Sequence, residues 1–172
     1  MSGSLHTWYS LPDLDMLAER AAVLEGEIPL KQMARLSDLL RANSGSVRAS
    51  LRFRQRLGGW LILRLEYEAT LQLTCQRCLE PLVHDVNANV ELGLLESDAV
   101  QSYSPEGVEP FVVEGGRFNP AVLIEDELIV ALPLVPRHER RSECGPIADR
   151  VGDASNNEPE GDARPSAPST SH

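Results

Sequence analysis

Two neighbouring cysteines are the first residues in this sequence whose type and spacing suggest chemistry. Cys75 and Cys78 form a C-x-x-C motif within the stretch LTCQRCLEPLVHDV. At a tight turn, two thiolates with this spacing supply half of a tetrahedral zinc site. The nearby residues able to complete it are few: His84, His138 and Cys144. The hypothesis is a Cys3His zinc site made of Cys75, Cys78, His138 and Cys144.

Two other interpretations of the motif remain open on the residues alone. A thiol-redox pair would place its first cysteine at a helix N-terminus, where the helix dipole lowers the thiol pKa. Here the motif joins two strand-like segments, and Pro81 starts the second one, which argues against that role. The other alternative is a turn with buried cysteines and no ligand, and this is the more common outcome for a lone C-x-x-C motif.

A stripe of arginines is the second feature. In VRASLRFRQRL the side chains of Arg48, Arg52, Arg54 and Arg56 share one strand face and could track phosphates, and Arg77 lies inside the cysteine motif. The alternative is a solvent-facing strand that uses charge to avoid aggregation, with nearby glutamates as partners. This alternative is favoured, because no aromatic stacking residue interleaves with the arginines.

A run of three acids, Glu125, Asp126 and Glu127, lies in a predicted helix. Consecutive helical residues point in different directions, so the run makes a poor metal site and is better suited to a polar strip or a basic partner. The chain offers no paired catalytic carboxylates, nucleophile with a base, or Gly-rich phosphate loop. We therefore expect no enzymatic activity and no small-molecule substrate.

Charge and composition limit the surroundings of the protein. The 172 residues carry a net charge of −10, and the pI is about 4.8, which disfavours broad contact with nucleic acid or anionic membranes. Three cysteines are too few for a disulfide scaffold, and MSGSLHTWYS lacks the features of a signal peptide. The longest apolar run, LIVALPLV, is too short to span a bilayer. We expect a cytoplasmic protein with reduced thiols and no membrane contact.

The N-terminal third should be helical. Ser10 precedes Pro12 and Asp13 as a helix start, Met16, Leu17, Ala21 and Leu24 recur at helical spacing, and Gly26 ends the run. A second short helix is predicted from Gln32 to Arg41, stopped by Asn43-Ser44-Gly45.

The hydrophobic period then changes to two. Runs starting at Val47 and after Gly58-Gly59 predict a hairpin, and matching their apolar faces requires a three-residue loop or a bulge. One such register pairs Arg52 with Glu66. A third strand follows the cysteines, and Glu109 to Val113 is a candidate short strand.

The last predicted helix begins at Asn119-Pro120, ends before Pro133, and is apolar enough to be largely buried. The predicted fold is therefore α+β, an antiparallel β-sheet with N-terminal helices and a buried C-terminal helix. Residues 1–144 form one domain, and the acidic, proline-rich residues 145–172 are expected to be a disordered tail.

Two motifs in this order resemble a known family. The stretch CQRCLEP with a histidine following, then IEDELIVALPLVPRH and a cysteine soon after, is similar to the YceD family, known as large ribosomal RNA subunit accumulation proteins. The resemblance covers roughly residues 28–144. Its motif positions in this chain are Cys75, Gln76, Arg77, Cys78, Glu125, Asp126, Glu127, Leu132, Pro133, Pro136 and His138.

The resemblance implies a non-enzymatic cytoplasmic factor needed for large-subunit rRNA to accumulate, acting in ribosome biogenesis. Its partner would be that rRNA or a pre-ribosomal or ribosomal protein. An acidic surface suits a basic ribosomal protein at least as well as RNA. The alternative from a different class is a thiol-redox or zinc-clipped interaction module unrelated to ribosomes.

Overall fold

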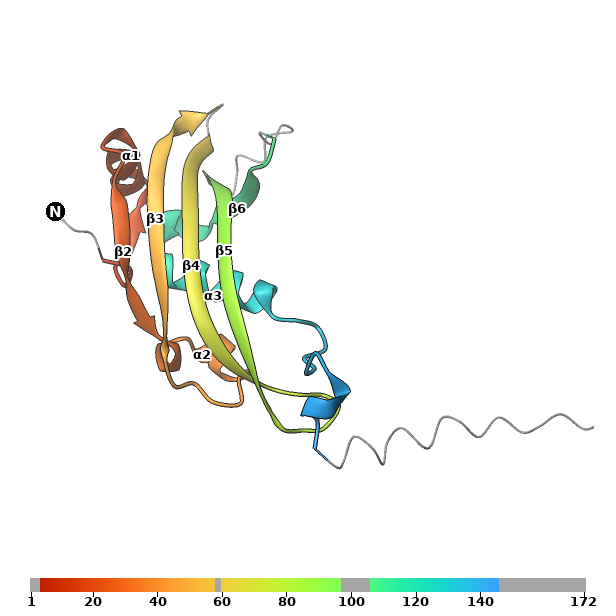
Figure 1. Cartoon of the computed structure of the whole chain (residues 1–172). Coiled ribbons are helices and arrows are strands. Elements are labelled where there is room, and N and C mark those ends of the chain that lie inside the picture. The colour runs from red at the N-terminus through yellow and green to blue at the C-terminus, as the bar shows by residue number, and fades with distance from the viewer. Residues whose placement is uncertain (1–3, 58–59, 97–105, 146–172) are drawn as a thin grey trace, which may run out of the picture.

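The computed structural model describes residues 4–57, 60–96 and 106–145, with side chains except at positions 55–57 and 96 (Figure 1). The expected tail beyond residue 145 and the side chain of Arg56 lie outside the described residues. The elements along the chain are β1 (Tyr9–Ser10), α1 (Leu11–Glu19), β2 (Val23–Pro29), a 3-10 turn (Leu30–Gln32), α2 (Ala34–Ser37), β3 (Ser46–Leu57), β4 (Trp60–Thr74), β5 (Pro81–Glu96), β6 (Glu109–Val113), a 3-10 turn (Glu114–Gly116), β7 (Arg117–Phe118), α3 (Pro120–Ala131) and a last 3-10 turn (Arg141–Glu143).

The fold is α+β and is built on a five-stranded sheet of order β2-β3-β4-β5-β6. The first four strands form an antiparallel meander, whereas β6 runs parallel to β5. This parallel pair departs from the predicted all-antiparallel sheet. A parallel neighbour requires a connection that crosses back along the sheet instead of a tight hairpin. The short strands β1 and β7 pair separately.

The N-terminal region differs from the predicted helices in extent. Ser10 caps α1, with Asp13 completing a capping box, but the helix ends at Glu19, and Leu24 lies in β2 instead of the helix. The two buried residues of β2, Leu24 and Ile28, lie four apart, a spacing that suits one face of a strand as well as one face of a helix, so pairing with β3 decides the structure. The second helical region is likewise shorter than predicted, since α2 spans one turn.

The long β3–β4 hairpin matches apolar faces through a bulge, as the sequence predicts. Phe53 lies opposite Leu63, and the register shifts between Arg54 and Leu57. The predicted pairing of Arg52 with Glu66 is wrong, because Arg52 lies opposite Arg64. With the bulge and a two-residue connection, the observed register differs from the predicted one by two positions. Because a shift by an even number of residues keeps every side chain on the same face, the apolar faces of the two strands still match.

One face of the sheet is covered by α1 and α3, and the other face is open (Figure 1). Between the layers lies the main core, to which α1 contributes Leu14 and α3 contributes Leu123, Ile124 and Leu128. Asn119 caps α3 by accepting a hydrogen bond from the Ala121 N–H at 2.9 Å, as the sequence predicts. Within the described residues, no helix is both long enough and apolar enough to cross a membrane.

Candidate metal centre

The C-x-x-C motif forms the turn between β4 and β5. The Cys75 N–H donates to the Glu80 carbonyl at 3.0 Å, and the Leu79 N–H donates to the Cys75 carbonyl at 2.8 Å. Leu79 closes the turn with a positive φ of 64°. Cys75 and Cys78 are buried and point to the same side, where they pack with Cys144.

The chain that follows α3 brings the other two candidate ligands to this turn. The Gln76 N–H donates to the Pro136 carbonyl at 2.8 Å, which fastens the segment two residues before His138. A 3-10 turn, Arg141–Glu143, then returns Cys144 toward the cysteines. We call Cys75, Cys78, His138 and Cys144 the Cys3His cluster, because their ligand atoms all lie within 4.8 Å of one another.

The spacing inside the Cys3His cluster suits a zinc ion. With Zn–S near 2.3 Å and Zn–N near 2.0–2.1 Å, a tetrahedral site separates its sulfur and nitrogen ligands by about 3.6 Å. His138 Nδ1 lies 3.5 Å from Cys78 Sγ and 3.6 Å from Cys144 Sγ. Three thiols and one imidazole are also the donor types that zinc prefers in structural sites.

The second nitrogen of His138 supports the same assignment. His138 Nε2 lies 3.1 Å from the Pro81 carbonyl, which can only accept a hydrogen bond. A neutral imidazole that donates from Nε2 to this carbonyl keeps the Nδ1 lone pair directed toward the sulfurs. A backbone carbonyl that orients a histidine in this way is typical of metal ligands.

Electrostatics explain why the three thiols benefit from a cation. Burial acts to raise the pKa of Cys75, but N–H groups of His138, Arg77 and Cys78 favour its thiolate and lower the pKa to about 5. The pKa of Cys144 is raised to about 11 by burial and then by its contacts with Cys78 and Cys75. Without a cation, one sulfur of the cluster therefore favours the charged thiolate and another favours the neutral thiol. A bound divalent ion would stabilise the thiolate form of both.

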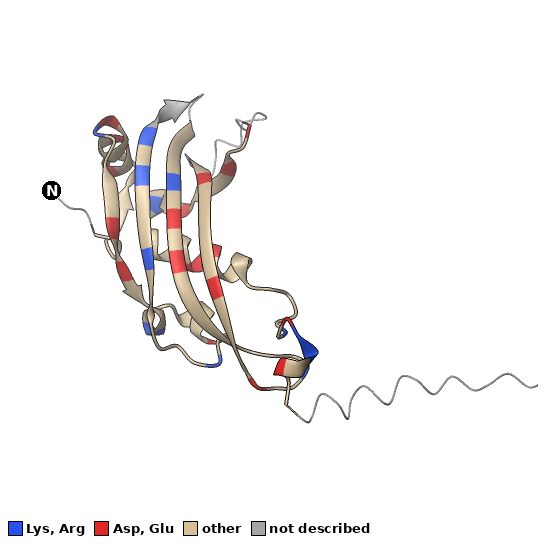
Figure 2. Ribbon diagram, in the orientation of Figure 1, with Lys and Arg blue, Asp and Glu red and all other residues tan. Residues whose placement is uncertain are grey.

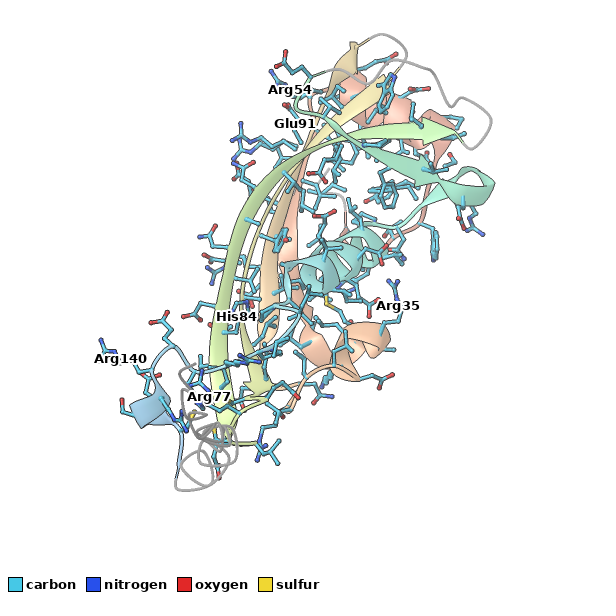
Figure 3. All side chains as sticks on the ribbon, turned by 90° about the vertical axis from the view of Figure 1, so that its right-hand side faces the viewer. Arg35, Arg54, Arg77, His84, Glu91 and Arg140 are labelled. Carbon is cyan, nitrogen blue, oxygen red and sulfur yellow. The ribbon has the colours of Figure 1, made fainter. Side chains whose placement is uncertain are left out.

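Of the other predicted site residues, Arg77 lies nearest to the cluster, with its Nη1 3.9 Å from Cys144 Sγ. His84, the alternative ligand, is on β5 and does not belong to the cluster (Figure 3).

Arg48, Arg52 and Arg54 of the arginine stripe are exposed and lie on the face of β3 opposite the core. The strands beside β3 carry acidic residues (Figure 2). Arg48 forms ion pairs with Glu27 and Glu68. Arg54 pairs with Glu91 at 2.9 Å. Arg52 has no ion pair among the described residues and faces Arg64 across the strands. Two of the three arginines of the stripe whose side chains are described are therefore neutralised within the chain.

The three acids of α3 lie on the helical side of the sheet and differ in environment. Glu125 is 8 % exposed, accepts from the buried Leu36 N–H at 3.1 Å, and pairs with Arg35 at 3.0 Å. Asp126 pairs with the same guanidinium at 2.6 Å. Burial, with Glu109 and Asp126 nearby, raises the pKa of Glu127. The contact between Glu125 and Arg35 has no local signature in the sequence, because 90 residues separate the two partners.

The chain is similar in sequence to proteins that share one description. A family model described as "Large ribosomal RNA subunit accumulation protein YceD" matches residues 63–169, a span that contains the whole Cys3His cluster. A protein with the same description from Haemophilus influenzae (strain ATCC 51907 / DSM 11121 / KW20 / Rd) is 27% identical over 122 residues, which is 70% of each chain. No solved structure gave a significant match.

Proposed function

This chain belongs to the YceD family, and we propose on that basis that it supports the accumulation of large-subunit ribosomal RNA during ribosome biogenesis. The observation that carries the proposal is the family match over residues 63–169. In the proposal the protein acts in the cytoplasm, as a binding factor and not as an enzyme.

The burial of the cysteines supports a binding role over the thiol-redox alternative. Cys75 is 0% exposed and Cys78 is 1% exposed. A redox cysteine must reach the sulfur of a second molecule, and such cysteines are partly accessible. The low pKa of Cys75 arises from N–H donors that also suit a metal-bound thiolate.

Charge supports a ribosomal or pre-ribosomal protein as the partner more than direct contact with RNA. Arg48 and Arg54 are engaged by acids of the same sheet. Phosphate groups would have to displace these carboxylates, whereas a basic protein surface meets a chain with a net charge of −10.

The Cys3His cluster enters the proposal as a structural zinc site. Bound zinc would join the β4–β5 turn to the segment after α3, which stabilises the fold without supplying a reaction. We expect about one zinc per chain in protein purified without chelator, and loss of most of it in Cys78→Ser. His84→Ala is the matched control, and zinc content equal in the two variants would refute the site.

The functional proposal is tested in cells that lack this protein. We expect sedimentation profiles with a selective deficit of large subunits, a lowered ratio of large- to small-subunit rRNA, and restoration of both by the intact gene. A normal rRNA ratio in the deletion strain would refute the proposal, whatever the metal content of the protein.

A further inference from the structure

One edge of the sheet is left open along most of its length. β5 pairs with β4 from Pro81 to Leu94, but β6 pairs with β5 only from Leu92 to Glu96. Within the described residues, no strand pairs with the outer edge of β5 from Leu82 to Glu91, which we call the free β5 edge. Figure 3 views the molecule from this side, and His84 marks the free edge.

The hydrogen-bond pattern identifies the backbone groups that this edge presents. In an antiparallel sheet, alternate residues of a strand direct their backbone N–H and C=O groups to one neighbouring strand, and the residues between them to the other side. The Cys75 N–H bonds to the Glu80 carbonyl, and the Phe53 N–H bonds to the Ala22 carbonyl. Both bonds lead to the same assignment of residues to sides across the sheet. Even-numbered residues of β5 therefore bond to β4. The N–H and C=O groups of the odd-numbered residues face outward: Val83, Asp85, Asn87, Asn89 and Glu91.

The free β5 edge has few of the devices that protect strand edges from pairing. The opposite edge of the sheet, β2, is seven residues long and contains Pro29. In contrast, residues 82–91 include no proline, lysine or arginine and no bulge in their pairing with β4. A long, regular edge of this kind is a template for an added strand.

Apolar side chains beside the edge are only partly covered. Ala88 and Val90 of β5, and Ile129 and Leu132 at the end of α3, pack on the core but stay partly exposed. Val130 is 81% exposed. An added strand in line with β6 would bury one face of its side chains against this row. The edge has defined ends, since β6 closes it above and the contact between His138 and Pro81 closes it below.

The charge beside the edge selects among strands. Asp85 accepts a hydrogen bond from Thr70, and neither it nor Glu109 or Glu127 has an ion pair with a basic side chain among the described residues. The raised pKa of Glu127, caused by burial and then by Glu109 and Asp126, is consistent with uncompensated negative charge here.

We propose that the free β5 edge binds an extended, basic segment of a partner protein as an additional strand of the sheet. Backbone hydrogen bonds supply affinity, and alternating basic and apolar side chains supply selectivity. Identification of the partner as a basic ribosomal or pre-ribosomal protein rests on the proposed function, whereas the binding mode rests on the geometry alone.

The first test measures amide hydrogen exchange in the full chain by NMR, with and without a synthetic eight-residue peptide of alternating valine and lysine. We expect the odd-numbered amides from Val83 to Asn89 to exchange freely in the protein alone. Peptide at about ten times its Kd should slow them about tenfold, whereas the even-numbered amides, which β4 already protects, should exchange slowly before peptide is added. A peptide with glutamate in place of lysine is the matched control.

Three results would overturn the proposal: no slowing at the odd-numbered amides, equal slowing by the acidic peptide, or slow exchange before peptide is added. The last result would assign the edge to this chain itself or, if it depends on concentration, to a second copy.

A second test uses substitution at one outward-facing amide. Asn87→Pro removes an N–H that has no partner among the described residues, a position where an edge strand accepts proline, and Asn87→Thr is the control that keeps the N–H. We expect Asn87→Pro to abolish peptide protection and lower large-subunit rRNA in cells, with Asn87→Thr close to wild type. If the deletion strain loses large-subunit rRNA and the Asn87→Pro protein restores it, strand addition at the free β5 edge is refuted. The proposed function would still stand.

Discussion

Glu125 gives the sharpest test of the packing between α2 and α3. The sequence suggested that the acids of this helix form a polar strip or contact a basic partner, and in the structure Glu125 bonds to groups of its own chain. Its carboxylate accepts from the buried Leu36 N–H at the start of α2 and pairs with Arg35 at 3.0 Å. Glu125→Ala would leave that N–H buried and unsatisfied. The loss of a hydrogen bond to a charged group destabilises by about 1.5–3 kcal/mol.

The ion pair with Arg35 adds less, because the arginine side chain is 54% exposed. A partly exposed pair contributes about 0–1 kcal/mol. We therefore expect Glu125→Ala to lower the free energy of unfolding by about 2–4 kcal/mol. Glu125→Gln keeps an acceptor for Leu36 and should lose about 1 kcal/mol.

Asp126→Ala is the matched control, since Asp126 pairs with the same guanidinium but accepts no hydrogen bond from a buried N–H. It should lose at most about 1 kcal/mol. Urea unfolding of the full chain measures all three values at unchanged m. Equal, small losses in Glu125→Ala and Asp126→Ala would refute the capping role. If large-subunit rRNA also fell in cells carrying a stable Glu125→Ala protein, the residue would be a partner contact instead.

Three further substitutions test other parts of the sheet. Burial, Glu127 and Glu109 raise the pKa of Tyr67 to about 12. Because the folded-state pKa lies above the usual value of 10, stability present below pH 10 should be lost as the pH rises through 12. The expected loss is about 2–3 kcal/mol, and urea unfolding at several pH values should show it in wild type and not in Tyr67→Phe. Gly93→Ala places a Cβ against the Trp60 ring and should destabilise by about 1–3 kcal/mol, seen as a lower urea midpoint. Arg52→Glu replaces the like-charge pair with Arg64 by an attractive pair and should raise the unfolding free energy by about 0.5 kcal/mol at low salt. An unchanged or lower value would contradict that register.

Local sequence signals predicted the parts of the fold that local chemistry determines. The Asn119-Pro120 start of α3 was found because capping residues identify it directly, and the long strands β3 and β4 were found because their side chains alternate with period two. The signals failed for Leu24, whose spacing suits two structures, and for the register at Arg52, which a bulge displaced by two positions. The direction of β6 could not be predicted, because it depends on where the connection from β5 leads.

The candidate metal centre was more predictable than the surrounding contacts. Few cysteines and histidines were available, so the ligand set followed from their types and their order along the chain. The capping contact between Glu125 and Leu36 leaves no comparable trace, because a buried N–H acceptor can come from any sequence distance. Arg52 and Arg54 look alike in sequence, yet only Arg54 has an ion-pair partner among the described residues.

The prolines of the LPLVP segment explain why this segment, among the described residues, does not pair with the free β5 edge. This segment leaves α3 beside β5. At its end, the Pro136 carbonyl accepts a hydrogen bond from the Gln76 N–H, which holds the segment to the β4–β5 turn. Pro133 and Pro136 lack N–H donors, so the segment cannot form an uninterrupted ladder with β5. Leu134 between them is 102% exposed and packs against no part of the core. His138 of the Cys3His cluster lies next to the first residue of β5, with its Nε2 3.1 Å from the Pro81 carbonyl. The segment therefore has two effects: it fixes the chain after α3 to the β4–β5 turn, and it leaves the neighbouring strand edge without a partner strand among the described residues.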